Sequence, residues 1–315
     1  MRIAIPDLIS NSYFPAIAAV ELGLFQDEGC DATLDLLFPV TRTMAALRDG
    51  QLDFVVGAAH ATLSAFPDWR GARLLCAVAQ RMYWFLVVRS DLRPRRGDVS
   101  VVRGLRIGAA PGPDAGLLRL LAEAGLDPGR DDIQVGPVPG TTEASVSFGV
   151  TAARALEKGD LDGFWANGMG AQVAVDRGIG TIVLDVRRGD GPPAAIDYTF
   201  PALVTTETLL ARHPEEAAGA VRAIVRAQHI LAAEPDRATD IARRIFPPLE
   251  TGLIAALIRR DLPYYDATIT PHAVERLNAF SRAAGLLSAD ATVGYEDVVA
   301  TQLSELWHPA SRDVR

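Results

Sequence analysis

The sequence predicts an α/β protein built from two similar lobes with a cleft between them, and three observations support this. Residues 44–57 read as a helix end, a glycine stop at Gly50 and a short apolar strand. A second copy lies 109 residues further along, within residues 155–165. Two charged, Pro- and Gly-containing breaks, at residues 90–98 and 187–195, mark points where the chain can cross between lobes. The matching positions are Leu47, Gly50, Leu52 and Asp53 in one copy and Leu156, Gly159, Leu161 and Asp162 in the other.

The elements expected in the first lobe alternate between strands and helices, which is typical of a mainly parallel sheet covered by helices. The strands are expected at residues 2–6, 32–38, 53–57, 72–78 and 84–89, and the helices at 13–28, 41–49 and 59–66.

The second lobe is expected to repeat this alternation and then return the chain to the first lobe. Its strands are expected at residues 105–109, 133–138, 161–165 and 181–185, and its helices at 117–124, 150–158 and 171–177. A strand at 198–205 returns to the first lobe, and the rest is mostly helical. The predicted boundaries are therefore 1–88 with 199–315 for lobe 1, and 89–198 for the inserted lobe 2. Two crossings form a hinge, and the cleft faces the carboxyl ends of both sheets.

Composition excludes several classes of partner. The chain has 315 residues, of which 49% are hydrophobic and 22% charged, as expected for a globular protein with a sizeable core. A net charge of −8 argues against nucleic-acid or anionic-membrane partners, which need basic patches. No apolar stretch approaches the roughly 18–20 residues that cross a bilayer, so no membrane insertion is expected. The start of the chain lacks a signal-peptide pattern, which predicts a cytoplasmic location as given and a periplasmic one if a signal was removed.

Motifs for metals, cofactors and catalysis are absent from the sequence. Cys30 and Cys76 are the only cysteines, and their apolar surroundings predict two buried free thiols. No CxxC or Cys/His metal spacing occurs, and no Walker loop, GxGxxG, HExxH or GxSxG is present. We therefore predict no cofactor, no metal and no catalytic residue from motifs alone.

Three segments together resemble a known family. They are the Tyr13…Glu21-Leu-Gly-Leu-Phe25 start, the Ala45-Ala-Leu-x-x-Gly-x-Leu-Asp-Phe-x-x-Gly57 signature and Val102-Arg-Gly-Leu-Arg-Ile-Gly108. Their order and spacing resemble type II periplasmic binding proteins, in the branch of nitrate, sulfonate and taurine binders and thiamine-pyrimidine proteins. The resemblance implies two Rossmann-like lobes that close on a ligand by hinge motion. It also implies a substrate-binding protein of an ABC-type transporter, with a permease partner and a sulfonate, carboxylate or pyrimidine-like ligand.

The same resemblance leaves an enzymatic alternative open, because a minority of this family are cytoplasmic enzymes. An aromatic sulfinate desulfinase of this type uses a nucleophilic cysteine in the loop after the first strand. Here that loop carries Ser12, so desulfination is not expected. A hydrolase or decarboxylase using His60, Arg81 and Asp197 remains an alternative. A cytoplasmic ligand sensor is a third, although nothing resembles a DNA-binding or signalling module.

Candidate ligand-binding residues of the first lobe follow its strands. Asn11, Ser12 and Tyr13 precede a helix N-terminus, which suits a polar or anionic group, although Ser and Asn also act as plain helix caps. Thr41 and Arg42 open the next helix, where a threonine cap and a solvated arginine are the simpler explanations.

Two further candidates of this lobe stand at strand ends. His60 follows the repeat strand through small residues that let a ligand approach the backbone, although a lone histidine is more often structural. Arg81 is the preferred partner for a carboxylate or sulfonate. Trp69 and Trp84 are assigned to the core.

The second lobe offers matching positions. Gly112 and Asp114 precede a helix, and Asp114 would cap it and favour a neutral or cationic ligand. Thr141 and Thr142 form the next turn.

Four more residues complete the candidates. Trp165 and Asn167 end the second repeat strand, where the tryptophan could stack on a planar ligand or pack in the core. Asp197 and Tyr198 lie at the return crossing, as hinge or pocket residues. The repeated Asp53 and Asp162 are assigned to architecture rather than catalysis.

Overall fold

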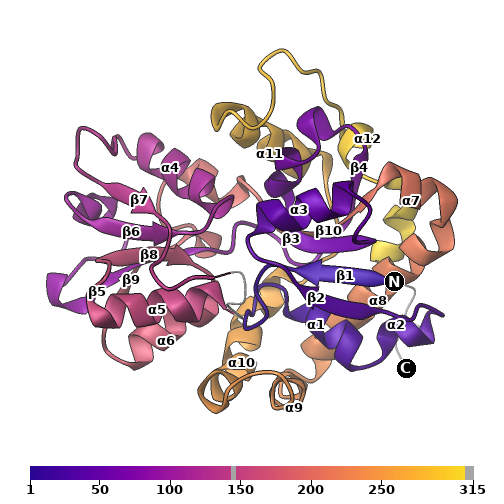
Figure 1. Cartoon of the computed structure of the whole chain (residues 1–315), viewed down its shortest axis with the longest axis horizontal. Helices are drawn as coiled ribbons and strands as arrows, with labels where there is room; N and C mark the ends of the chain where they lie inside the picture. The colour runs from indigo at the N-terminus through magenta and orange to yellow at the C-terminus, as the bar shows by residue number, and fades with distance from the viewer. Residues whose placement is uncertain (143–146, 309–315) are drawn as a thin grey trace.

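Two five-stranded sheets form the two halves of the molecule (Figure 1). The computed structural model describes residues 1–142 and 147–308. The first sheet has the order β2-β1-β3-β10-β4 and the second the order β7-β6-β8-β5-β9. The strands of the first are β1 (Arg2–Ile5), β2 (Thr33–Leu36), β3 (Phe54–Ala58), β4 (Ala72–Ala77) and β10 (Pro201–Thr206). Those of the second are β5 (Phe85–Arg89), β6 (Arg106–Ala109), β7 (Gln134–Gly136), β8 (Gly163–Ala166) and β9 (Gly180–Asp185).

The two sheets share one topology, which confirms the predicted α/β fold with two Rossmann-like lobes. In the first, β1 pairs in parallel with β2 and β3, and β10 runs antiparallel between β3 and β4. In the second, β6 pairs in parallel with β7 and β8, and β5 runs antiparallel between β8 and β9. Each sheet therefore receives its antiparallel strand from one of the two chain crossings.

The strand predicted at residues 84–89 belongs to the second sheet and not, as expected, to the first. The sequence analysis places it beside 72–78 in lobe 1, whereas β5 pairs with β8 and β9 in the second sheet. The first crossing thus precedes Phe85 instead of following residue 88. The cause is that a continuous apolar run predicts a buried strand but carries no information on which sheet buries it.

Helices cover both sheets. The helix predicted at 13–28 is divided at Gly23, whose φ of 72° is left-handed, into α1 (Phe14–Glu21) and α2 (Leu24–Asp27). The segment predicted as a helix at 59–66 is a 3₁₀ helix over Ala59–Ser64. The remaining helices are α3 (Val40–Arg48), α4 (Pro113–Glu123), α5 (Phe148–Lys158), α6 (Gly168–Asp176), α7 (Glu207–Arg212), α8 (Pro214–Ala233), α9 (Arg237–Ala242), α10 (Pro248–Asp261), α11 (Pro271–Ala283) and α12 (Tyr295–Val298).

The repeated aspartates do the same structural work in both sheets. The Asp53 carboxylate accepts a hydrogen bond of 2.7 Å from the backbone N–H of Arg2, the first residue of β1. The Asp162 carboxylate accepts one of 3.0 Å from the N–H of Arg106, the first residue of β6. The Arg106 guanidinium also bonds Asp162 and lowers the pKa of that carboxyl. Each aspartate therefore anchors the neighbouring central strand, which confirms the architectural assignment.

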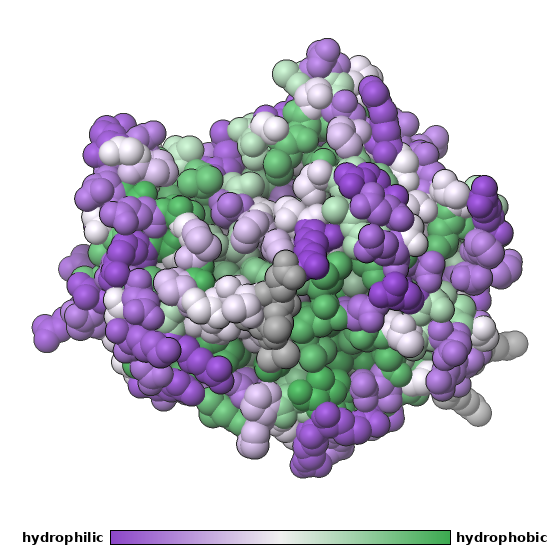
Figure 2. Space-filling model, in the orientation of Figure 1, coloured by the Kyte–Doolittle hydropathy of each residue, from purple (hydrophilic) through white to green (hydrophobic). Residues whose placement is uncertain are grey.

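The C-terminal helices tie the lobes together. Helix α8 packs on α1 and α2, whereas α10 reaches across to α6 of the other lobe, between the two halves (Figure 1). Both cysteines are buried free thiols, as predicted. Hydrophilic side chains cover the outer parts of both lobes on the face drawn in Figure 2, and apolar residues gather near its centre. No helix within residues 1–142 and 147–308 is long and apolar enough to cross a membrane.

Candidate functional site

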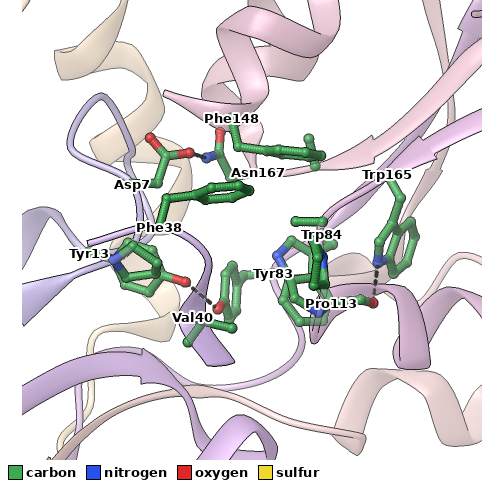
Figure 3. A pocket seen from close by; sticks show the side chains of 14 residues that line it. Asp7, Tyr13, Phe38, Val40, Tyr83, Trp84, Pro113, Phe148, Trp165 and Asn167 are labelled. Atoms are coloured by element: carbon green, nitrogen blue, oxygen red, sulfur yellow. Dashed lines mark hydrogen bonds between the residues drawn. The ribbon is translucent and has the colours of Figure 1, made fainter. Parts of the chain in front are cut away.

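A small cavity lies where the two lobes meet (Figure 3). Its volume is about 40 Å³, which is room for about three water molecules. Interfaces between lobes are common places for ligand sites. The two lobes touch around this cavity, where Phe38 stacks on Phe148 and Asp7 bonds Asn167. The lining residues are Pro6, Asp7, Tyr13, Phe38, Val40, Tyr83, Trp84, Ala110, Pro111, Pro113, Phe148, Trp165, Ala166 and Asn167.

Six of the fourteen residues that line the cavity are aromatic. Phe38 of the first lobe stacks on Phe148 of the second, with centroids 5.9 Å apart and an interplanar angle of 16°. Trp84 lies 6.0 Å from Trp165 and 4.9 Å from Tyr83. Trp84 is 4% exposed and belongs to the core, as predicted, and it also lines the cavity. These flat, weakly polar surfaces suit a planar ligand.

A pair of tyrosines supplies hydroxyl groups to the cavity. The Tyr13 and Tyr83 hydroxyls are 2.9 Å apart and share a hydrogen bond (Figure 3). Burial raises the pKa of both phenols, so both stay protonated at neutral pH. Tyr13 was predicted as a binding residue from the sequence, whereas Tyr83, two residues before β5, was not.

Asp7 is the one ionisable carboxyl in the lining, which contains no Lys, Arg or His among the described residues. It is 6% exposed, and its Oδ2 accepts a hydrogen bond of 2.8 Å from the Asn167 amide of the other lobe. Burial raises the pKa of Asp7 to about 7, against the lowering effect of the polar groups around it, which belong to Ser147, Phe148, Gly149 and Asn167. Asp7 was not among the site residues predicted from the sequence, although an acid directly after a buried strand was the signal that could have found it.

Asn167 and Trp165 line the cavity at the end of β8, as the sequence analysis expected of their position. The Asn167 Oδ1 caps α6 by accepting hydrogen bonds from the N–H groups of Met169 and Gly170. The Trp165 indole N–H donates to the Pro113 carbonyl at 3.1 Å. Their positions therefore fit a binding role that remains a prediction.

His60 joins the lobes but does not line the cavity. It is 1% exposed, its Nδ1 lies 3.0 Å from the Thr199 Oγ1, and its Nε2 lies 3.1 Å from the Gly112 carbonyl oxygen. A neutral ring satisfies both, with Nε2–H donating to the carbonyl and Nδ1 accepting from the hydroxyl. Burial lowers the pKa of His60 to about 4, which keeps it neutral.

The loop that carries Gly112 packs directly on the first lobe. Gly112 has a φ of 98°, and a Cβ there would lie 2.8 Å from Val40 Cγ1 and 3.6 Å from Thr41 Cγ2. Only glycine fits this approach, so Gly112 and Thr41 serve the closed contact between lobes. Asp114 accepts hydrogen bonds from the N–H groups of Gly112 and Ala115 and so fixes the loop.

Several other predicted residues lie outside the cavity. Arg81 is exposed with a φ of 66°, its guanidinium carbon lies 5.7 Å from the Tyr264 ring centre, and it borders a separate groove together with Asp197. Arg42 is exposed on α3. Neither arginine lines the cavity, so a binding role for Arg81 or Arg42 stays a prediction.

The last predicted residues pack around the cavity. Tyr198 is buried and stacks on Phe280 at 4.6 Å, which makes it part of the core beside the hinge. Thr141 and Thr142 border a shallow pocket next to the Phe38–Phe148 pair. Ser12, which precedes Tyr13 in the sequence, is buried and does not border the cavity.

A buried ion pair behind the cavity escaped the sequence analysis. Arg187, which follows β9, pairs with Asp261 at the end of α10 across 3.3 Å, and both side chains are at most 5% exposed. The Asn11 amide donates to the same Asp261 at 2.6 Å, so the predicted Asn11 holds this pair instead of lining the cavity. The Arg187 guanidinium carbon also lies 4.9 Å from the Tyr264 ring centre. From the sequence, Arg187 was assigned to the second charged break, at residues 187–195.

No metal site is evident within the described ranges, where no group of three or more His, Cys, Asp or Glu side chains could hold an ion. The arrangement can therefore enclose a small planar molecule and offer it carboxyl, amide and phenol groups.

Comparison with known proteins agrees with this arrangement. The nitrate-binding protein of Synechocystis PCC 6803 superposes with a TM-score of 0.74 at 14% identity, covering 96% of this chain and 86% of that one. The alkanesulfonate-binding protein of Xanthomonas axonopodis pv. citri, bound to MOPS, gives a TM-score of 0.69 at 17% identity, covering 95% and 97%. The chain has the fold of the periplasmic solute-binding proteins.

The solute-binding fold also includes enzymes. A desulfurization enzyme in complex with biphenyl-2-sulfinic acid superposes with a TM-score of 0.64 at 17% identity, covering 97% of this chain and 98% of that one. The sequence model of the NMT1-like family matches residues 96–246. A search of the curated proteins finds no match. The predicted resemblance to the type II periplasmic binding proteins is thus confirmed at the level of fold.

Proposed function

We propose that this protein is a solute-binding protein that closes its two lobes around one small planar molecule. The observation that carries the proposal is the cavity between the lobes, which has aromatic walls and a single buried carboxyl group. Aromatic side chains of both lobes, such as Tyr13 and Trp165, line the cavity and would contact the faces of a flat ligand. In an ABC-type importer such closure would present the loaded form to a permease outside the cytoplasm.

The cavity chemistry favours one of the three ligand classes expected from sequence. Asp7 can accept a hydrogen bond from a ligand N–H, and the lining provides no cationic side chain among the described residues. A sulfonate or carboxylate would enter without a counter-charge, which is costly in an apolar site. The ligand we propose is a neutral or cationic nitrogen heterocycle of the aminopyrimidine type. The closed volume of about 40 Å³ implies that the lobes open to admit it.

A binding screen tests this proposal. Protein freed of bound ligand by unfolding and refolding is titrated calorimetrically with 4-aminopyrimidine and cytosine, and separately with nitrate, methanesulfonate and taurine. A heterocycle is expected to bind at one site per chain and to raise the melting temperature, because a ligand at 100 times its Kd stabilises the native state by about 2.7 kcal/mol. Binding of the anions alone would contradict the proposed ligand class and leave the binding function standing.

One observation favours an enzymatic function as a second candidate. Asp7 lies in the cavity with a pKa raised to about 7, the range suited to general acid–base catalysis. Mass spectrometry of the bound heterocycle after incubation separates the candidates. A transport protein returns it unchanged, whereas an enzyme consumes it, and Asp7→Asn then abolishes turnover. Sulfinate cleavage through a cysteine is not supported, because neither Cys30 nor Cys76 lines the cavity.

A further inference from the structure

Two helices of the second lobe begin beside Asp7. Helix α5 starts at Phe148 with Ser147 as its N-cap, and α6 starts at Gly168 with Asn167 as its N-cap. Phe148 and Asn167 both line the cavity. Backbone N–H groups at a helix start carry partial positive charge and attract anions. The second lobe therefore presents an anion-attracting surface to the cleft.

The chain supplies its own anion to this surface. Asp7 comes from the loop after β1 in the first lobe, and its Oδ2 accepts the 2.8 Å hydrogen bond from Asn167 (Figure 3). The backbone N–H groups of Phe148 and Gly149 and the Ser147 hydroxyl also interact with the carboxyl group and lower its pKa. The second oxygen, Oδ1, is buried without a well-formed hydrogen bond among the described residues.

We propose that Asp7 is a built-in anion that occupies the anion-binding position at the starts of α5 and α6 and makes the cleft reject anionic solutes. This inference rests on the proposed function of the cleft and deepens it by naming the residue that selects the ligand. An anionic ligand in a cavity of about 40 Å³ would lie within a few ångströms of the carboxylate, where little water screens the repulsion. Repulsion of the wrong ligand is an established route to specificity.

A variant that removes the Asp7 carboxylate should let a small anion bind at the starts of α5 and α6. Asp7→Ser removes the charge and leaves space, so the Asn167 amide and the N–H groups at the start of α5 become available to a small anion. Asp176→Ser is the matched control, because Asp176 is exposed on α6 and its loss changes the net charge equally. Any general effect of net charge on anion affinity appears in both variants.

The experiment is calorimetric titration of the whole chain with nitrate, sulfate and methanesulfonate at about pH 8, where Asp7 is ionised. Asp7→Ser is expected to bind at least one anion about 10-fold more tightly than wild type, equivalent to about 1.4 kcal/mol. Asp176→Ser is expected to match wild type. Equal anion affinity in wild type and Asp7→Ser would overturn the inference.

A second measurement covers the case in which Asp7→Ser fails to fold. Wild-type affinity for methanesulfonate is expected to rise as pH falls from about 8 to about 6, because Asp7 becomes protonated with a pKa of about 7. Asp7→Asn, which has the same shape without the charge, is expected to lose this pH dependence. A slope unchanged in Asp7→Asn would overturn the inference. If the proposed function is wrong, wild type will bind no heterocycle, and this outcome does not depend on the affinities measured for the anions.

Discussion

The two repeat strands, β3 and β8, begin alike and end differently. Each starts next to an aspartate that accepts the first N–H of the neighbouring central strand, Asp53 for β1 and Asp162 for β6. At their carboxyl ends, β3 leads to His60, which bonds the Gly112 carbonyl of the other lobe, and β8 carries Trp165 and leads to Asn167 in the cavity wall. The shared half of the motif builds the sheet and the divergent half serves the cleft.

The different ends of β3 and β8 correspond to two functions of the cleft, which are closure of the lobes and contact with the ligand. The end of β3 supplies an interlobe contact that is buried away from the cavity, so it acts on closure alone. The end of β8 supplies surface to the cavity and caps α6, so it acts on closure and on the ligand. Variants at the two ends are expected to affect stability and affinity in different proportions, and the predictions below run from the largest effect to the smallest.

Trp165→Ala should give the largest effect. Truncation of a fully buried tryptophan is expected to lower the free energy of unfolding by about 3–5 kcal/mol and to weaken heterocycle binding at least 10-fold. Trp69→Ala is the matched control, because Trp69 is 1% exposed and bonds Asn278 outside the cavity. Urea denaturation should show similar losses for both, and calorimetry should show lost affinity for Trp165→Ala only. Equal affinities would remove Trp165 from the site.

The pH dependence of stability should next separate the contribution of His60 from that of Asp7. His60, with a pKa lowered to about 4 from 6.5, contributes stability that is complete above pH 6.5 and is lost as pH falls towards 4. Asp7, with a pKa raised to about 7 from 3.8, contributes in the opposite sense, with stability that is lost as pH rises from 3.8 to 7. The two slopes oppose each other between about pH 4 and 6.5 in the wild-type protein.

Single variants should reveal the two slopes. Relative to wild type, the unfolding free energy of Asp7→Asn is expected to rise with pH between about 4 and 6.5, and that of His60→Gln to fall over the same interval. Urea denaturation across this range measures both differences, so that the other titrating groups cancel. Slopes of the same sign in the two variants would refute the assignment of opposite roles.

Asn167→Ala should have a moderate effect. Loss of the α6 cap is expected to cost about 1 kcal/mol of unfolding free energy. Thr206→Ala is a matched control, because the Thr206 hydroxyl caps α7 away from the cavity. Only Asn167→Ala also loses the bond to Asp7, so it alone should shift the ligand-free protein towards an open form with a larger radius of gyration in X-ray scattering. An equal radius in both variants would count against that bond as a closure contact.

Arg81→Ala should have the smallest effect. Arg81 is exposed in the separate groove that it borders with Asp197. Heterocycle affinity is therefore expected to change by less than about 2-fold, within calorimetric error of wild type. A loss comparable with that of Trp165→Ala would restore Arg81 to the binding site and undo the distinction between cavity and groove.

Local sequence patterns were sufficient for the fold. The repeat, the alternation of strands and helices and the breaks depend on neighbours in sequence, so the two lobes could be predicted. The sheet that receives β5 could not, because strand pairing is a long-range choice among buried strands of similar composition.

The site was predictable only in part. The rule that ligands meet the carboxyl ends of strands placed Tyr13, Trp165 and Asn167 in the cavity wall. The same rule also selected Arg81, which is exposed and does not line the cavity, and it was not applied to Asp7. The Arg187–Asp261 pair joins residues far apart in the chain, and no local pattern marks such a pair.

Helix α10 has a consequence for how fast a ligand can leave. The lobes are joined by two crossing strands and by α10, whose Asp261 holds Arg187 in a buried ion pair that is expensive to break. We therefore expect the two lobes to separate first at the edge where Phe38 stacks on Phe148. These two residues also border the shallow pocket that Thr141 and Thr142 line. If the lobes part at this edge, the stacking of these two rings would slow the release of a bound solute. In the proposed transport function, opening at this edge would limit the rate of ligand release. The opposite edge, held by the Arg187–Asp261 ion pair, would act as the hinge of the opening.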